Sequence, residues 1–183
     1  MRELSLNILD IAQNSVSAGA SLVEILINIY EKEDRFEIII KDNGKGIKED
    51  FLKNITDPFV TTRTTRKVGM GLPFFKFSAE QSGGHFDISS KSGVGTTVKA
   101  EYVISSIDRM PLGDIGETVL SLIISSENVN YLFKVKSDKG EGYLDTREIK
   151  ETLDGLPISS SEVISFLRDY MQENISILYG GLV

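Results

Sequence analysis

The first residues of chemical interest are an aspartate and an asparagine in a segment with helical periodicity. Asp10 and Asn14 stand four residues apart, and this spacing puts both side chains on one face of an α-helix. A carboxylate can orient a water molecule or act as a base, and an amide oxygen can hold a hard cation such as Mg²⁺. A solvated helix face would carry the same pair, so the pair alone leaves both interpretations open.

A second group follows an apolar, strand-like run. The residues from Asp42 to Ile47 read Asp-Asn-Gly-Lys-Gly-Ile. An aspartate at a strand end can accept a hydrogen bond from an exocyclic amine, and Gly44 and Gly46 allow a flat ring to approach the backbone closely. Ile40 and Ile47 would form the walls of an apolar slot. An ordinary Asp-Asn-Gly hairpin turn is the alternative interpretation.

A third group lies at a loop-to-helix junction. It consists of Arg66, Lys67, Gly69, Met70, Gly71 and Leu72. Backbone amides at a helix start bind anions, and glycines leave those amides accessible. The spacing fits neither a Walker A loop nor a dinucleotide-binding fingerprint. A glycine-rich turn beside a solvated basic run is the alternative.

A fourth group contains a threonine in a glycine-rich turn. Gly93 and Gly95 stand in the turn between two expected strands, and Thr96 begins the second of them. Taken by itself, this group is also consistent with a simple β-turn.

Hydrophobic patterning predicts the elements that position these groups. A helix is expected from Leu4 to about Ser17, with Gly19 as its left-handed cap. Its expected buried face consists of Leu4, Leu6, Ile8, Leu9, Ile11 and Ala12. Strands are expected at 22–30, 36–40, 86–89 and 96–103, and a second helix between Gly71 and Gly83. The segment from Lys48 to Val68 has no clear periodicity, which is typical of a functional lid or of disorder.

Residues 105–183 show their own pattern. After a connector to Gly116 come an apolar segment at 119–124, a strand at 131–136 and a turn at 137–142. Asp145 or Thr146 is expected to cap a short helix to Leu153. The run from Ser159 to Glu162 predicts a capped final helix to about Asn174. We expect these elements to extend the sheet, with a separate lobe as the alternative.

The composition is that of a globular protein of one domain, or one domain with an appendage. The chain has 183 residues, 40% hydrophobic and 26% charged, and it contains no cysteine. Disulfides and thiolate chemistry are therefore excluded. The sequence has neither a long apolar run nor a signal peptide, so we expect a cytoplasmic protein without membrane contact.

Negative charge is concentrated in the second part of the chain. Residues 1–104 carry 13 basic and 14 acidic residues, whereas residues 105–183 carry 7 and 13. A net charge of about -6 on residues 105–183 argues against nucleic acid as a partner, because phosphate binding requires a basic surface. This part presents either a solvated acidic surface or an acidic docking face for a protein.

Together, in this order, the four groups resemble the ATPases and kinases named for gyrase, the heat-shock chaperone, histidine kinases and MutL. Asn14 matches the asparagine of the family's N box, and the run from Asp42 to Ile47 matches its first glycine box. The run from Asp57 to Thr62 resembles the phenylalanine-containing box of histidine kinases, Gly69–Leu72 the second glycine box, and Gly93–Thr96 the last box. The resemblance covers residues 4–104.

The resemblance implies a two-layer α/β sandwich of the Bergerat type, with helices on one face of a mixed sheet and a small α/β extension at 105–183. It implies that Asp42 accepts from the adenine amine of ATP, that Asn14 ligates Mg²⁺, and that Thr96 supports the adenine site. Gly69 and Gly71 would bind the phosphates, and Arg66 and Lys67 would contact the γ-phosphate from a lid. His85, the single histidine, starts a strand and is expected to be structural.

Two positions depart from the pattern. Asp10 stands where MutL-like members and anti-sigma kinases carry a glutamate base, and its carboxylate reaches about 1.5 Å less far. Ser17 replaces an acidic residue common in MutL-like versions. Either the backbone compensates for Asp10, or hydrolysis is slow.

These features predict an ATP-Mg-binding protein that phosphorylates or switches a separate protein. No phosphoacceptor helix precedes the first box, so we do not expect a self-contained sensor kinase. A slow ATPase clamp and a non-catalytic ATP-sensing module are the alternatives. The oligomeric state stays open, a homodimer included.

Overall fold

A single mixed sheet organises the molecule. The computed structural model describes residues 3–52, 55 and 71–182, and within them six strands follow the order β3-β4-β2-β1-β5-β6. The strands are β1 (Leu22–Tyr30), β2 (Arg35–Asp42), β3 (His85–Lys91), β4 (Gly95–Val103), β5 (Asn130–Ser137) and β6 (Gly140–Asp145). Only the β1–β5 pair is parallel among these strands.

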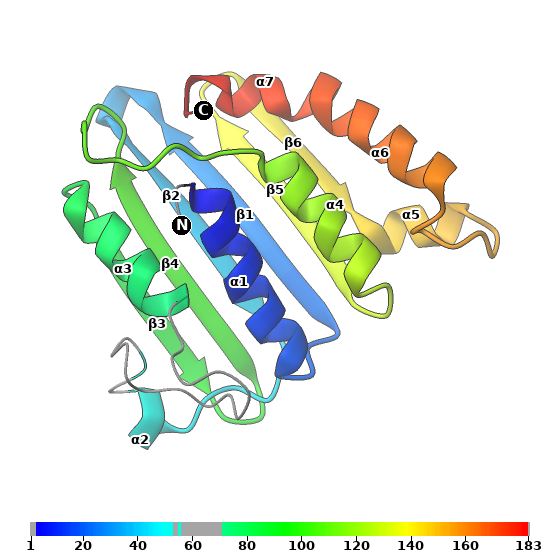
Figure 1. The fold of residues 1–183 in the computed structure, drawn as a ribbon, viewed down its shortest axis with the longest axis horizontal. Coiled ribbons are helices and arrows are strands. Elements are labelled where there is room, and N and C mark those ends of the chain that lie inside the picture. The colour runs from blue at the N-terminus through cyan, green and yellow to red at the C-terminus, as the bar shows by residue number, and fades with distance from the viewer. Residues whose placement is uncertain (1–2, 53–54, 56–70, 183) are drawn as a thin grey trace.

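Helices cover one face of this sheet, where α1, α3 and α4 lie side by side (Figure 1). The α-helices are α1 (Leu4–Ser17), α2 (Glu49–Leu52), α3 (Gly71–Gln81), α4 (Ile115–Ser125), α5 (Thr146–Thr152), α6 (Ser161–Asn174) and α7 (Ser176–Tyr179). Short 3-10 turns occur at Glu31–Glu33 and Gly180–Leu182. The arrangement confirms the predicted two-layer sandwich with a mixed sheet.

Strict alternation in β1 explains the two faces of the sheet. Val23, Ile25, Ile27 and Ile29 are buried beneath the helices, because successive strand residues point to opposite faces. The opposite face carries charge, and Glu24 on β1 pairs with Lys41 on β2 at 3.1 Å. The pattern that predicted a strand thus also determined which face is covered.

The first helix ends where the sequence predicted, but one side chain points elsewhere. Gly19 follows α1 with φ +77°, a left-handed geometry that glycine adopts at little cost. Leu4, Ile8, Ile11 and Ala12 are buried. Leu6, expected on the same face, is 43% exposed, because the sixth residue lies about 200° around the helix from the fourth.

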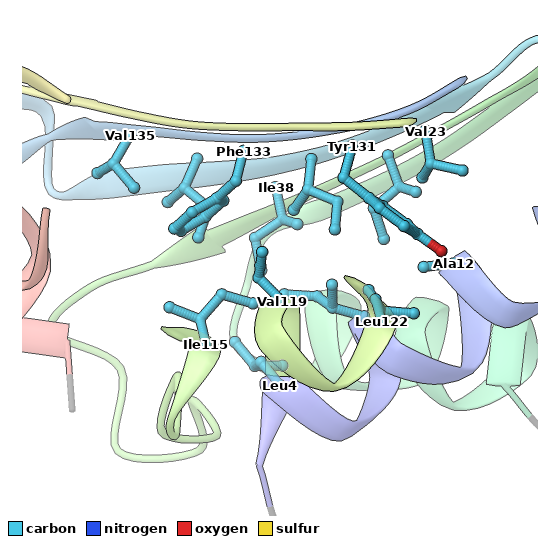
Figure 2. Close-up of a cluster of buried hydrophobic side chains, with 14 of the residues drawn as sticks. Leu4, Ala12, Val23, Ile38, Ile115, Val119, Leu122, Tyr131, Phe133 and Val135 are labelled. Atoms are coloured by element: carbon cyan, nitrogen blue, oxygen red, sulfur yellow. The ribbon is translucent and has the colours of Figure 1, made fainter. Parts of the chain in front are cut away.

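The core is formed between the helices and the sheet (Figure 2). The helices contribute Leu4, Ala12, Ile115, Val119 and Leu122, and the strands contribute Val23, Ile38, Tyr131, Phe133 and Val135. Residues before and after position 104 share this cluster. Apolar burial therefore joins the two parts of the chain into one packing unit.

Residues after 104 continue the sheet. Leu22 of β1 pairs in parallel with Asn130 of β5, and the pairing continues to Asn28 and Lys136. β6 then pairs antiparallel to β5. Of the two arrangements considered from the sequence, the structure shows the extension of the sheet.

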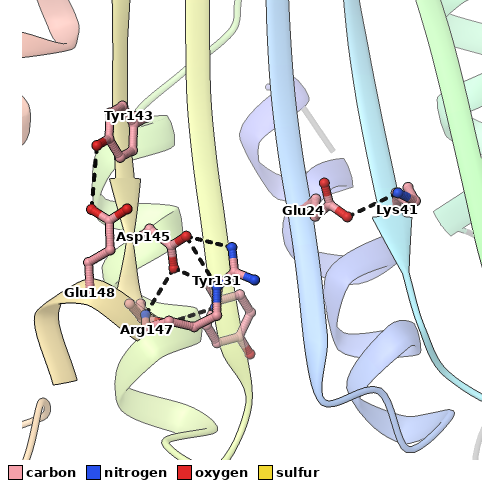
Figure 3. A network of polar contacts seen from close by, with 8 residues as sticks. Glu24, Lys41, Tyr131, Tyr143, Asp145, Arg147 and Glu148 are labelled. Carbon is pink, nitrogen blue, oxygen red and sulfur yellow. Dashed lines mark hydrogen bonds and ion pairs between the residues drawn. The ribbon is translucent and has the colours of Figure 1, made fainter. Parts of the chain in front are cut away.

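Polar contacts attach α5 to β6. Asp145 accepts from the backbone N of Arg147 at 2.9 Å and forms an ion pair with the Arg147 guanidinium at 2.6 Å (Figure 3). The carboxylate therefore caps α5, as predicted for one of the two candidate residues. The Thr146 hydroxyl instead accepts from the Tyr131 backbone N at 2.8 Å.

The connector after β4 fastens both ends of the chain. Pro111 O and Leu112 O accept from the backbone N atoms of Leu4 and Ser5. Leu112 N and the Arg109 guanidinium both donate to Leu182 O, at 3.0 and 3.1 Å. The start of α1 is thereby tied to the last described residues.

Three details differ from the sequence predictions. The four-residue helix α2 lies in the segment taken as irregular, and β6 begins at Gly140, inside the expected turn. The final helix, α6, ends at Asn174 as predicted, but Ser160 before it makes no side-chain capping hydrogen bond, so the predicted cap is wrong. Among the described residues, no helix is long and apolar enough to cross a membrane.

Candidate functional site

Asp42 stands at the end of β2, on the face of the sheet covered by helices. Its register partners are Val23 on β1 and Thr96 on β4. Oδ2 accepts from the Ser15 hydroxyl of α1 at 2.7 Å, and Oδ1 accepts from the Gly44 backbone N at 2.8 Å. Two donors from different elements therefore fix the plane of this half-buried carboxylate.

The loop after Asp42 is held on both sides. The Asn43 side chain accepts from the backbone N atoms of Ser21 and Leu22 at 2.9 and 3.0 Å. Lys45 N donates to Ala18 O at the end of α1, at 3.0 Å. These contacts hold the loop between the start of β1 and the end of α1.

Ser90 of β3 joins the other side of this loop to Thr96. Its hydroxyl accepts from Ile47 N at 2.8 Å and lies 2.9 Å from the Thr96 hydroxyl. Ile47 and Thr96 are both half-buried, whereas Ile40 is buried in the core. The run from Asp42 to Ile47 and the run from Gly93 to Thr96 are therefore connected through Ser90, which was not predicted from the sequence.

Glycines allow these backbones to approach one another. A Cβ on Gly95, which has φ +138°, would lie 1.9 Å from Asp42 O. A Cβ on Gly46, at φ +66°, would lie 2.1 Å from Lys91 O. At Gly44 a Cβ would lie 3.0 Å from Asp42 Oδ1. The glycines therefore allow the loop after Asp42 and the start of β4 to pack closely against one another, which fixes the backbone around Asp42.

Asp10 lies on the side of α1 that faces α3, and Asn14 follows it one helical turn later. Both are half-buried and engaged in interactions. A Cβ on Gly71, the first residue of α3, would lie 1.9 Å from Asp10 Oδ2. The carboxylate therefore packs directly against the start of α3, where partial positive charge attracts anions.

The junction before α3 is described only from Gly71 onward. Gly71 is buried, and Leu72 packs at the edge of the core. Arg66, Lys67, Gly69 and Met70 lie outside the described residues, as does the predicted box from Asp57 to Thr62.

The structure brings most of the described candidates together. Asp10 on α1 packs against Gly71 on α3, while Asp42 pairs with Thr96 and bonds to Ser15, the neighbour of Asn14 on α1. Ser15 was missed by the sequence analysis, although it follows Asn14 and lies on the buried side of α1. Its partner Asp42 is 27 residues away, so local spacing gave no signal for the contact.

The arrangement fits a nucleotide with a metal ion. A carboxylate with oriented oxygens and glycine-lined backbone suits an adenine amine, and the start of α3 suits phosphates. Among residues 3–52, 55 and 71–182, no three His, Asp or Glu side chains gather in a metal-binding geometry. Asn14 lies one helical turn after Asp10, and its amide oxygen is of the type that could ligate Mg²⁺.

His85 lies apart from these groups. It is the exposed first residue of β3 and pairs with Glu101 of β4. Glu101 lies five positions after Thr96, a separation of roughly 17 Å along a strand.

Comparison with known proteins agrees with this geometry. The family of histidine kinase-, DNA gyrase B- and HSP90-like ATPases matches residues 1–104. A putative sensor histidine kinase NtrY-like of Rickettsia conorii is 27% identical over 108 residues, covering 59% of this chain and 18% of that protein. The sensor protein KdpD of Clostridium acetobutylicum is 36% identical over 104 residues, covering 54% and 11%. The chain thus spans less than a fifth of the length of these relatives.

A solved structure shares the fold. The crystal structure of the N-terminal domain of a DNA repair protein aligns with a TM-score of 0.56 and 16% identity, over 79% of this chain and 53% of that one. This coverage exceeds the 104 residues that match the family, so elements after residue 104 have counterparts in that fold. The chain belongs to the family of histidine kinase-, DNA gyrase B- and HSP90-like ATPases, and the matching residues form its ATP-binding domain.

Proposed function

We propose that this chain binds ATP-Mg and uses it to phosphorylate or switch a separate protein. The observation that carries the proposal is the separation of His85 from the candidate site. His85 is the single histidine in the sequence. Its pairing partner on β4, Glu101, is five residues from Thr96, a separation of roughly 17 Å along the strand. His85 therefore does not reach this site within the same copy of the chain, which supports a phosphoacceptor on a separate protein.

The nucleotide-binding residues have distinct roles in the proposal. Asp42 accepts from the adenine amine, with Ser15 and Gly44 orienting its oxygens. Asn14 holds Mg²⁺, which supplies charge neutralisation at the phosphates. Gly71 opens α3 toward the phosphates, and Arg66, Lys67, Gly69 and Met70 complete the phosphate site as the family resemblance implies.

The contact between Asp10 and Gly71 bears on catalysis. A side chain shorter than glutamate reaches the start of α3 because Gly71 has no Cβ in the way. This supports the view that the backbone compensates for the shorter side chain. Asp10 is then the candidate base, and its distance to the substrate depends on how closely the start of α3 packs against α1.

The test measures three quantities on one preparation. ATP-Mg binding is measured by calorimetry and phosphate release by a coupled assay. Phosphate transfer is measured as radiolabelled γ-phosphate that appears on proteins retained by the immobilised chain. Transfer to a retained protein supports the proposal. Binding with phosphate release but without transfer supports the ATPase alternative, and binding alone supports the sensor.

A matched pair of variants provides the control. Asp42→Asn replaces the proposed acceptor with a group that also donates, and we expect ATP affinity to fall more than tenfold. Asp87→Asn makes the same change at an exposed position of β3 on the uncovered face. Equal ATP binding by both variants and the parent would contradict the assigned pocket.

A further inference from the structure

Asn7 is a buried amide inside an apolar helix face. Its side chain is on α1 with 1% relative exposure, and neither Nδ2 nor Oδ1 has a hydrogen-bond partner among the described residues. A buried polar group without a partner destabilises the fold, and such groups are rare enough in folded proteins to require an explanation.

The position of Asn7 places it beside the candidate site. It precedes Asp10 by three residues and Asn14 by seven, so all three side chains lie on one side of α1. That side faces α3, because Asp10 packs against Gly71. The opposite side of α1 carries Ser5, whose backbone N bonds to the connector.

In the structure, Asp10 occupies the start of α3. Its Oδ2 lies so close to Gly71 that no Cβ would fit there. A carboxylate is stabilised at a helix start for the same electrostatic reason as a phosphate. The two anions repel one another when both are within a few ångströms in a partly buried site.

We infer that Asn7 is a positioning residue that receives Asp10 when phosphates bind. The incoming phosphates displace the Asp10 carboxylate from Gly71, and Asn7 Nδ2 donates a hydrogen bond to it. Side chains three residues apart on a helix have Cβ atoms about 5–6 Å apart, within reach of such a bond. The inference rests on the proposed function, since it requires ATP-Mg at this site.

The first test uses Asn7→Leu, which keeps the size of the side chain and removes its polar atoms. We expect the nucleotide-free protein to melt about 2–6 °C higher, because an unpaired amide is lost. We expect ATP-Mg affinity to fall about tenfold, because the displaced Asp10 carboxylate loses the donor that would receive it. A purely structural role for Asn7 would change the melting temperature without changing this affinity.

Tyr131→Phe is the matched control. The Tyr131 hydroxyl is also buried on β5, near Ser126 but without a hydrogen bond of normal geometry. Its removal tests whether deleting any unpaired buried polar atom changes ATP binding. We expect unchanged ATP-Mg affinity, and a tenfold loss in this variant would overturn the specific role of Asn7.

A double-mutant cycle with Asp10→Ala decides the inference. We expect Asn7→Leu to weaken ATP-Mg binding in the parent and to have no effect in the Asp10→Ala background, because the two residues act as one unit. Equal effects in both backgrounds would overturn the inference. Failure of the parent to bind ATP-Mg would instead overturn the proposed function, and this inference with it.

A measurement on the unmodified Asn7 side chain is independent of variant stability. The side-chain amide resonances of Asn7 are expected to shift when ATP-Mg is added to the parent and to stay in place in Asp10→Ala. If the parent protein binds ATP-Mg and the chemical shifts of the Asn7 side-chain amide do not change, the proposed hydrogen bond is contradicted.

Discussion

The Ser15 hydroxyl on α1 donates a 2.7 Å hydrogen bond to Oδ2 of Asp42 at the end of β2. This bond joins the helix that carries Asn14 to the carboxylate assigned to adenine. In the proposed site, α1 therefore carries the residue assigned to Mg²⁺ and also orients the carboxylate assigned to adenine.

Replacement of Ser15 tests this link. Ser15→Ala removes the donor to Asp42, and we expect ATP affinity to fall about tenfold, since hydrogen bonds to charged groups contribute about 1.5–3 kcal/mol. Ser17→Ala is the control, because the Ser17 hydroxyl bonds to Gln13 O within α1 and not to Asp42. Calorimetric titration with ATP-Mg measures the difference, and equal affinities would show that Asp42 does not need Ser15.

Gly93 in the β3–β4 turn and Gly95 at the start of β4 allow the cost of a positive φ to be measured separately from the cost of a steric clash. Gly93 and Gly95 both have positive φ, but only Gly95 faces a backbone atom, Asp42 O. We expect Gly93→Ala to destabilise the protein by about 1 kcal/mol and Gly95→Ala by more than about 3 kcal/mol. Urea unfolding measures both, and similar losses would show that the close approach of Gly95 to Asp42 is not important.

A buried carboxylate on the uncovered face of the sheet predicts a pH effect. Burial acts to raise the pKa of Glu37, but hydrogen bonds from Lys99, Asn28 and Tyr30 outweigh it, and the net pKa lies below the ordinary 4.5. A carboxyl with a lowered folded-state pKa contributes stability above its unfolded-state pKa and loses it as the pH falls through the folded-state value. The contribution of Glu37 is therefore present at neutral pH and lost below about pH 4.5.

Glu37→Gln is expected to destabilise the protein at about pH 7 and to have a smaller effect at about pH 3. Urea unfolding at both pH values provides the measurement. Glu141→Gln is the control, because Glu141 forms an exposed ion pair with Lys134, and such pairs contribute about 0–1 kcal/mol. A loss that is the same at both pH values would contradict the assignment to the ionised carboxylate.

The connector offers a test of how firmly the chain ends are held. The Arg109 guanidinium donates to Ile104 O, Met110 O and Leu182 O, and burial lowers its pKa. Arg109→Met keeps length but removes all three bonds, and we expect a loss of about 2–4 kcal/mol. Arg168→Met, at the ion pair with Glu117 in which both side chains are about half exposed, is expected to cost less in the same unfolding assay.

The sequence predicted the elements whose periodicity is local. α1 has the predicted bounds, and β1 alternates as expected, because apolar spacing alone sets which side is buried. Leu6 was misplaced because a list of apolar residues does not determine the angle of each around the helix. The expected cap at Ser160 failed because a capping bond depends on side-chain geometry that residue type does not fix.

Candidate site residues could be predicted only where they belong to a short motif that is contiguous in the sequence. Asp42 and Thr96 were identified as separate groups, and their direct pairing across β2 and β4 required the register of the sheet. Ser15, Ser90 and Asn7 were missed, because their importance comes from partners, or from the lack of a partner, far along the chain.

The parallel pairing of β1 with β5 has a consequence for the order of synthesis. Residues 22–28 find their partners at 130–136, roughly 100 residues later. At about 5–20 residues per second, the ribosome needs several seconds to supply them. All residues assigned to ATP are therefore synthesised before β5, the parallel partner of β1. During that interval one edge of β1 is unpaired, and a nascent chain in this state is open to non-native strand pairing.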